Sequence, residues 1–506
     1  MTTIGEMSLW VALMLAAWAG IVSILASSRG VTSLEASGER GIHAVLALVS
    51  LAAVALWSAM LTHDFSVAHV ARFTSANLPR IYLFAAIWSG REASWLFATL
   101  MLSAAAFLAV VRHRMGVRAN PVFTGIVAVI IALALALLCL TLNPFERLSW
   151  TPLEGQGLHP QLQSPGMALH PPILYAGYVA TVIPFALAVT AIIDRGLSRQ
   201  AMASVRQWIL ASWLLTTVGI FLGVWWAYGE PAFGTGWLRY TFENGSLLPW
   251  GVSTVFLCAS SIQKRRGLAR GWNLTLVIAA FVLSAGAMIL TIGRIASISA
   301  DGTSSPSLWL AGVTAFAIAA GGYLVSARVA DIPAISRMPR GDALRRIGLA
   351  LVVAALVSIS AGLAGRSFLR ASDVILQPAQ SAAVNDGFDR TWTLTSQGTS
   401  QYDILNRRVT AIALDLESAD GGRFLVSSEL RHHLDSRRAR VFEPSREPGI
   451  RGGWLQDVYI VLNEVSEDGA ASVTISFNPM VRWLWIGGAL LIVGGLLVFS
   501  PRGSEA

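Results

Sequence analysis

The sequence predicts an all-α polytopic membrane protein that carries one β-rich extracytoplasmic domain. Of its 506 residues, 54% are hydrophobic and only 13% are charged, and the mean hydropathy is +0.60. An ordinary soluble domain has about 25% charged residues, because water covers its surface. Apolar runs fill most of the chain, and one segment near the C-terminus changes to β-type patterning. This composition excludes a disordered chain, a secreted disulfide scaffold and a collagen-like repeat.

The apolar runs predict about eleven transmembrane helices, since a helix needs about 20 mainly apolar residues to cross a bilayer. The first run is expected to be a retained helix, because no basic segment precedes it and no small-residue cleavage site follows it. We expect a helical bundle over 1–364, and a final helix with a short cytoplasmic tail over 481–506. The expected spans lie near 8–27, 42–62, 93–111, 122–142, 170–193, 207–227, 247–263, 272–291, 306–327, 346–364 and 481–499.

Basic residues in the loops predict the orientation, because cytoplasmic loops are enriched in Lys and Arg. One alternating set of loops holds eighteen of them, and the short loops of the other set hold six. The basic set is therefore expected in the cytoplasm. This puts the N-terminus and 365–480 outside and the C-terminus inside, and the net charge of +8 needs no nucleic acid to explain it.

The segment 365–480 is expected to form a small antiparallel β domain. Its apolar residues alternate or are β-branched, and Gly, Asp and Asn separate the runs. Strands are expected within Arg390–Leu394, Arg408–Leu416, Val458–Leu462 and Ala471–Phe477.

Three expected outer loops are rich in Trp, Pro and His. The third carries four Trp within 26 residues, together with an adjacent Glu and Asn. Trp at a membrane boundary has a plain explanation, because its amphipathic ring prefers the headgroup level. Such a dense cluster also fits a flat, apolar, anionic ligand such as a porphyrin, which needs ring faces, Arg side chains and an imidazole. Both interpretations are open at this point. The residues concerned are Trp225, Trp226, Trp237, Trp250, Glu243 and Asn244.

His170 is expected at the outer start of a span, where Pro171 and Pro172 restrict the backbone. A histidine there can be a structural hydrogen-bonding residue or a ligand. His159 lies in the same loop and could pair with it only if the loop folds back. Cys139 and Cys258 lie far apart inside apolar runs and carry no metal or redox signal.

Several segments resemble, in order over nearly the whole chain, the CcmF family of cytochrome c maturation haem lyases. The matching stretches include Trp88-Ser-Gly-Arg-Glu-Ala-Ser94, Leu158-His-Pro-Gln-Leu-Gln163, His170-Pro-Pro-Ile-Leu-Tyr-Ala-Gly-Tyr178, Trp225-Trp-Ala-Tyr228, Glu243-Asn-Gly-Ser-Leu-Leu-Pro-Trp250 and Asn478-Pro-Met-Val-Arg-Trp-Leu-Trp-Ile-Gly-Gly488.

The resemblance implies a multi-pass protein of the inner membrane that attaches haem to a CxxCH apocytochrome c on the periplasmic side. It also implies a haem chaperone and other membrane subunits of a maturation complex as partners. Carried over by position, His170 corresponds to an outer haem-ligand histidine. The resemblance assigns haem contacts to the Trp-rich loop at Trp225, Trp226, Trp237, Glu243, Asn244 and Trp250.

The chain departs from the family pattern at positions where the family has histidine or a Trp-Asp pair. The histidine positions carry Arg91, Ser299 and Arg346, and the Trp-Asp pair is replaced by Arg239-Tyr240. Arg can hold a propionate but does not ligate iron. We therefore expect transient haem with no permanently buried one, and secondary contacts from His159, Arg91 and Arg346. The iron is expected to be held by His170 alone, or by His170 together with His159, His63, His69 or the histidine of the apocytochrome's CxxCH motif.

Two hypotheses of different class remain after this comparison. The first is a divergent haem lyase subunit. The second is a non-catalytic paralogue that serves as a structural subunit of a membrane assembly complex, or that handles another amphipathic ligand. A channel or transporter is disfavoured because no Asp, Glu or Lys lies in mid-span.

Overall fold

The computed structural model of the chain describes residues 1–114, 120–194, 198–231, 245–266, 270–297, 340–365, 368–388, 390–418, 421–434 and 442–499. The chain divides into two compact units. We call residues 1–223 and 242–317 the helical unit, and residues 224–241 and 318–506 the sheet unit.

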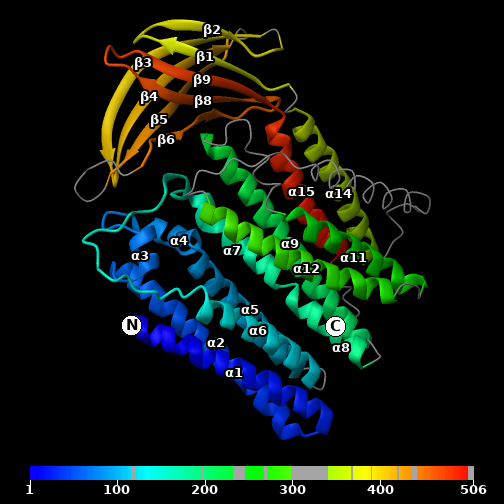
Figure 1. Cartoon of the computed structure of the whole chain (residues 1–506). Coiled ribbons are helices and arrows are strands. Elements are labelled where there is room, and N and C mark those ends of the chain that lie inside the picture. Colours follow the sequence, from blue (N-terminus) through cyan, green and yellow to red (C-terminus); the bar gives the residue numbers. More distant parts are fainter. Residues whose placement is uncertain are drawn as a thin grey trace. The chain divides into compact units, whose positions relative to one another are not determined.

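The helical unit is a bundle in which α1 lies along α2 and α6 (Figure 1). Small residues allow this close contact, because a Cβ at Gly41 of α2 would lie 2.8 Å from the Cβ of Ala19 on α1. The elements are α1 (Thr2–Arg29), α2 (Thr32–Leu61), α3 (Ala68–Phe73), α4 (Arg80–Ser89), α5 (Arg91–Arg114), α6 (Pro121–Leu140), η1 (Pro160–Leu162), α7 (Pro165–Val179), α8 (Val182–Ile193), α9 (Arg199–Gly229), α11 (Leu247–Arg266) and α12 (Arg270–Ser297).

The prediction of a multi-pass helical protein is confirmed. Nine helical segments within the described residues are long and apolar enough to cross a membrane, and the apolar part of α11, Leu247–Ser260, is shorter. Together they account for ten of the eleven expected spans. The remaining one, 306–327, lies outside the described residues.

The expected span 170–193 is made of two helices, α7 and α8. Pro184 has no N–H to donate to the carbonyl of Ala180, so the regular hydrogen-bond pattern cannot continue through this point. The hydroxyl of Thr181 instead donates to the carbonyl of Tyr178 at 2.6 Å.

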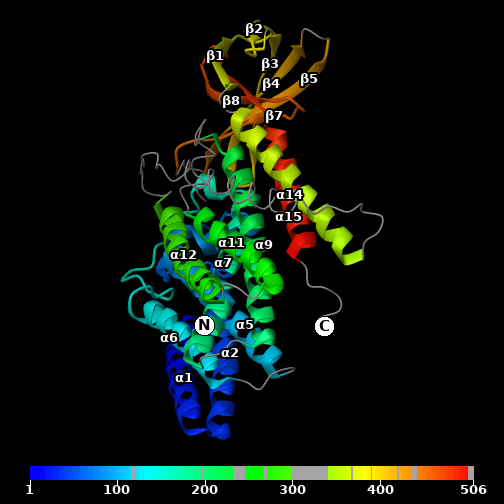
Figure 2. The same cartoon turned by 90° about the vertical axis from the view of Figure 1, so that its right-hand side faces the viewer.

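The sheet unit contains two antiparallel sheets at one end of the helix pair α14 (Arg340–Gly365) and α15 (Val481–Phe499) (Figure 2). One sheet has the order β1-β9-β8-β7 and the other β2-β3-β4-β5-β6. The strands are β1 (Arg370–Leu376), β2 (Ser381–Asn385), β3 (Thr391–Ile404), β4 (Arg407–Ser418), β5 (Arg423–His433), β6 (Ser445–Glu447), β7 (Gly449–Arg451), β8 (Gln456–Val465) and β9 (Ala471–Pro479).

The two sheets enclose one apolar core. Alternate residues of β3, β4, β8 and β9 point into it, including Leu394, Leu414, Ile460 and Phe477. The expected strands overlap these four strands, with Arg390 lying just before β3, and every strand pair is antiparallel, as predicted. The helix pair packs through glycines, because a Cβ at Gly348 would lie 2.9 Å from the carbonyl oxygen of Gly494.

Candidate functional site

His170 lies inside α7 rather than at its start. The helix begins five residues earlier at Pro165, because the hydroxyl of Ser164 accepts the backbone N–H of Met167 and Pro165 is pre-set for the first turn. Pro171 therefore lies within the helix. The side chain of His170 is only 3% exposed, so it belongs to the interior of the helical unit.

The imidazole of His170 faces α9 and is oriented by its backbone. Its Nδ1 lies 2.8 Å from the carbonyl oxygen of Gly219. A carbonyl oxygen only accepts, so Nδ1 carries the proton and Nε2 carries the lone pair of the neutral ring. This is the arrangement in which a second group fixes the tautomer of a ligating histidine. A structural histidine would make the same hydrogen bond.

Glycines bring α7 and α9 close enough for this contact. A Cβ at Gly223 would lie 2.6 Å from Cε1 of His170, and a Cβ at Gly219 would lie 3.0 Å from the Cα of Leu174. On the facing helix, a Cβ at Gly177 would lie 2.6 Å from Oγ1 of Thr216. Sequence reasoning missed this crossing, although Gly219 and Gly223 form a GxxxG pattern, a known signal of close helix contact in membranes.

Trp250 belongs to α11 and packs against α9 in the same unit. Its ring is stacked with Trp213 at a centroid distance of 6.0 Å. Its indole N–H donates to Thr217 at 2.9 Å, and the indole of Trp213 donates to Thr254 at 2.8 Å. Trp250 and His170 thus both bond to α9, at positions 217 and 219.

Tyr178 forms a buried polar contact between α7 and the segments that follow α9. Its hydroxyl lies 2.6 Å from the hydroxyl of Ser246 and 3.4 Å from that of Thr291. Tyr178 lies about two turns after His170 along α7, so this contact fixes the helix beyond the imidazole.

The last turn of α9 belongs to the sheet unit and carries two of the predicted Trp residues. Trp225 is 47% exposed, whereas Trp226 is 3% exposed. Of these two, Trp225 is therefore the one with an exposed ring. Trp226 is part of the packed interior.

Hydrogen bonds attach this turn to β8. The hydroxyl of Tyr228 donates to Asp457 at 3.1 Å, and the hydroxyl of Tyr459 donates to the carbonyl of Tyr228 at 3.2 Å. The two tyrosine rings lie 5.5 Å apart. The Asp457 carboxylate also accepts the backbone N–H of Gly453 at 2.9 Å. The β sheets thereby hold the turn that carries Trp225.

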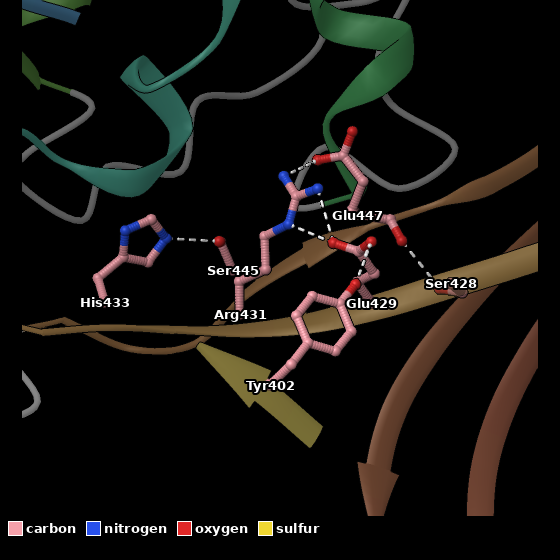
Figure 3. A network of polar contacts seen from close by, with 7 residues as sticks. All are labelled: Tyr402, Ser428, Glu429, Arg431, His433, Ser445 and Glu447. Atoms are coloured by element: carbon pink, nitrogen blue, oxygen red, sulfur yellow. Dashed lines mark hydrogen bonds and ion pairs between the residues drawn. The ribbon is translucent and has the colours of Figure 1, made fainter. Parts of the chain in front are cut away.

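A network of charges lies on β5 and β6 of the same unit (Figure 3). Arg431 bridges Glu429 at 2.7 Å and Glu447 at 2.6 Å, and the hydroxyl of Tyr402 donates to Glu429 at 3.1 Å. Burial raises the pKa of Glu230 well above its usual range, the Glu447 carboxylate raises it further, and Arg431 partly offsets both. Within the described residues no group of three or more His, Cys, Asp or Glu could hold a metal ion.

The other predicted contacts lie apart or outside the described residues. His159 is half-buried just before η1, and Arg91 is exposed at the start of α5. Arg346 lies on α14 in the sheet unit, not in the unit of His170. Trp237, Glu243, Asn244, Arg239, Tyr240 and Ser299 lie outside the described residues.

Comparison with known proteins places this architecture. The family described as Cytochrome C assembly protein matches residues 88–292. The chain is 32% identical to the cytochrome c-type biogenesis protein ccl1 of Rhodobacter capsulatus over 70% of this chain and 55% of that protein, so the match spans about half of that relative. It is 26% identical to the cytochrome c-type biogenesis protein CcmF of Pseudomonas aeruginosa, over 99% of this chain and 96% of that protein.

A solved structure gives the same picture for the fold. The cytochrome c haem lyase CcmF matches 99% of this chain and 98% of its own with a TM-score of 0.73, at 19% identity. The chain thus shares its fold with that haem lyase, and its residues 88–292 match the Cytochrome C assembly protein family. Over nearly its whole length it is similar to CcmF-type cytochrome c biogenesis proteins.

Proposed function

We propose that this chain is a haem-handling subunit of cytochrome c biogenesis. It receives haem from a haem chaperone and attaches it to apocytochrome c on the periplasmic side, together with other membrane subunits. The proposal rests on the similarity of the chain to cytochrome c biogenesis proteins of the CcmF type. Its main structural support is the buried imidazole of His170, whose Nδ1–H is bonded to Gly219.

The residues present fit a haem iron that would be held by one imidazole. The bond to Gly219 assigns the ring lone pair to Nε2, and the missing side chain at Gly223 leaves room for the ring. His170 would therefore hold the iron.

Haem, when bound, supplies the two vinyl groups to which the cysteine thiols of the apocytochrome add. The chain's contribution is to bind and orient, since correct placement of two reactants lowers the barrier for their reaction. The family's other histidine positions carry Arg91, Ser299 and Arg346. Ligation from one side by a single protein imidazole suits a haem that passes through, so we propose transient rather than permanent binding.

The second candidate function is a structural subunit that holds no haem. The observation in its favour is the same hydrogen bond between His170 and Gly219, because it satisfies a buried histidine without any ligand. The two candidates make opposite forecasts for the substitution of this side chain.

The test measures covalent haem in a reporter cytochrome against membrane levels of wild type, His170→Ala and His170→Asn. We expect both variants to lose maturation while the protein remains in the membrane, since the lost hydrogen bond costs only about 1 kcal/mol. Normal maturation in either variant would remove His170 from the mechanism. Abundance and maturation that fall together in the Ala variant and recover together in the Asn variant would favour the structural subunit.

An absorption spectrum of the purified protein supplies an independent test. Haem handling predicts a Soret band that grows on addition of haem and is weakened in His170→Ala. A preparation that takes up no haem but still binds partner subunits would support the structural candidate.

A further inference from the structure

The loop between β7 and β8, residues 452–455, carries two large apolar side chains on the surface of the sheet unit. Trp454 is 65% exposed and Leu455 is 62% exposed. The Trp454 ring has one charged neighbour, the guanidinium of Arg482 at 4.9 Å from its centroid. The packing of the two sheets does not explain why these two adjacent apolar side chains are exposed.

Hydrogen bonds place this loop beside the first turn of a membrane span. The backbone N–H of Met480 donates to the carbonyl of Leu455 at 2.7 Å, one residue before α15 begins. The indole N–H of Trp483, inside the first turn, donates to the carbonyl of Trp454 at 3.2 Å. The 19 residues of α15 form one of the candidate spans, so the loop lies at the level where that span starts.

The neighbouring span ends at the same level. Gly365 closes α14, and a Cβ there would lie 2.5 Å from the carbonyl oxygen of Pro479, just before α15. Phe368, three residues beyond Gly365, is 61% exposed. Exposed apolar side chains thus gather where the two spans of the sheet unit reach the bilayer surface.

We propose that the β7–β8 loop is a membrane anchor, with Trp454 and Leu455 inserted in the interfacial layer of the bilayer. Trp is favoured at this depth because its ring is apolar and its N–H is polar. Arg482 can extend its guanidinium to lipid phosphates while its stem stays in apolar surroundings. The patch continues the lipid-facing surface of the spans, on which Val357 is 65% exposed and Val493 is 48% exposed.

The anchor adds a contact between the sheet unit and the bilayer to those made by the spans. The loop carbonyls are already bonded to Met480 and Trp483, so the loop cannot turn away without breaking both contacts. The β sheets, and with them the last turn of α9, are therefore kept at one height above the membrane.

The test uses the full chain in lipid nanodiscs of mixed phosphatidylcholine and phosphatidylglycerol. Cys139 and Cys258 are replaced by Ser, and an NBD fluorophore is attached at Leu455→Cys. The matched control is Ile375→Cys, at a residue that is 69% exposed. Ile375 pairs with Ser472, seven residues before the end of β9, which places it roughly 23 Å along the strand from α15.

We expect the label at position 455 to show blue-shifted emission, quenching by spin-labelled lipid and loss of quenching by aqueous iodide. The label at position 375 should show the reverse. Equal iodide quenching at both positions would overturn the proposal. So would a position 455 that is wet in nanodiscs but protected in native membranes, because a protein partner would then cover it. The folded state of each variant is checked by its monodisperse elution before labelling.

Discussion

Gly223 determines how closely α9 approaches His170. Because a Cβ there would meet the imidazole at 2.6 Å, Gly223→Ala must displace the ring or separate the helices. We expect destabilisation of about 1–3 kcal/mol and a loss of cytochrome maturation larger than the loss of protein. Covalent haem in a reporter cytochrome, normalised to membrane levels, measures this effect.

Gly286→Ala on α12 is the matched control, since a Cβ at Gly286 would meet no atom within 4 Å. It should leave both maturation and abundance unchanged. Equal behaviour of the two variants would show that close contact with the imidazole is not needed.

The buried imidazole of His69 leads us to expect that the folded protein loses stability in mild acid. It is 3% exposed on α3 and lies against Phe73, with ring centroids 4.9 Å apart. Burial lowers its pKa to about 4, the backbone of Ala86 partly offsets this, and Arg72 adds to the lowering. The unfolded chain, with a histidine pKa of 6.5, binds more protons in this range, so stability is full above that pH and falls as the pH drops toward 4.

The contribution amounts to about 3 kcal/mol at most. Thermal unfolding of wild type and His69→Gln between pH 7.5 and 4.5 measures it. We expect the midpoint of wild type to fall more steeply with decreasing pH than that of the variant. Parallel curves would assign the acid sensitivity to other groups.

At the residue scale, the sequence singled out His170 but not its partner. A backbone carbonyl leaves no mark in the sequence, so Gly219 could not be recognised as an acceptor. The spacing of Gly219 and Gly223 did indicate close helix contact, yet the sequence does not say which helix makes it. Burial of Trp226 beside exposed Trp225 was also hidden, because adjacent aromatic residues look alike until the helix is packed.

At the element scale, the last turn of α9 depends on two tyrosine hydroxyls. Tyr228→Phe removes the hydrogen bond to Asp457, which costs about 1–2 kcal/mol and leaves a buried carboxyl with fewer partners. We expect faster hydrogen exchange at residues 224–230 and reduced maturation with His170 intact. Mass spectrometry of exchanged peptides provides the measurement.

Tyr402→Phe is the control for this experiment. The Tyr402 hydroxyl also donates to a carboxylate, that of Glu429, but it lies on β3 and donates to no residue of α9. Exchange in 224–230 should stay at the wild-type rate. If the control accelerated exchange as much as Tyr228→Phe, the effect would come from general loosening of the sheets.

Hydropathy predicted where the apolar helices lie, but not where an apolar run is divided into two helices. The run 170–193 is evenly apolar, so its average gives no sign that α7 and α8 are separate. Pro184 was the available signal, since proline removes one hydrogen bond a turn earlier. Short strands such as β6 and β7, with three residues each, were not predicted because they depend on partners far along the chain.

At the scale of the whole molecule, the charge of the loops predicts the side of the membrane. Eighteen basic residues against six predict that 365–480 lies outside the cytoplasm. Alkaline phosphatase fused after Glu417 should be active, and a fusion after Arg270 should be inactive. Activity in the opposite pair would reverse the orientation.

The multi-pass architecture could be predicted because apolar length is a local property of the sequence. The pairing of the strands could not, because register depends on residues that are distant in the chain. β1 illustrates this, since its partner is the last strand rather than the next one.

The pairing of β1 with β9 also determines when this sheet can form during biosynthesis. Arg370 pairs with Phe477, and 477 − 370 gives 107 residues that must be translated before the partner strand exists. At about 5–20 residues per second, the ribosome needs about 5–20 s for this stretch. During that interval α14 is already complete while β1 has an unsatisfied edge, a state prone to misassociation. A nascent chain stalled before β9 should therefore bind chaperones and be cleaved by protease, whereas release of α15 from the ribosome would close the sheet.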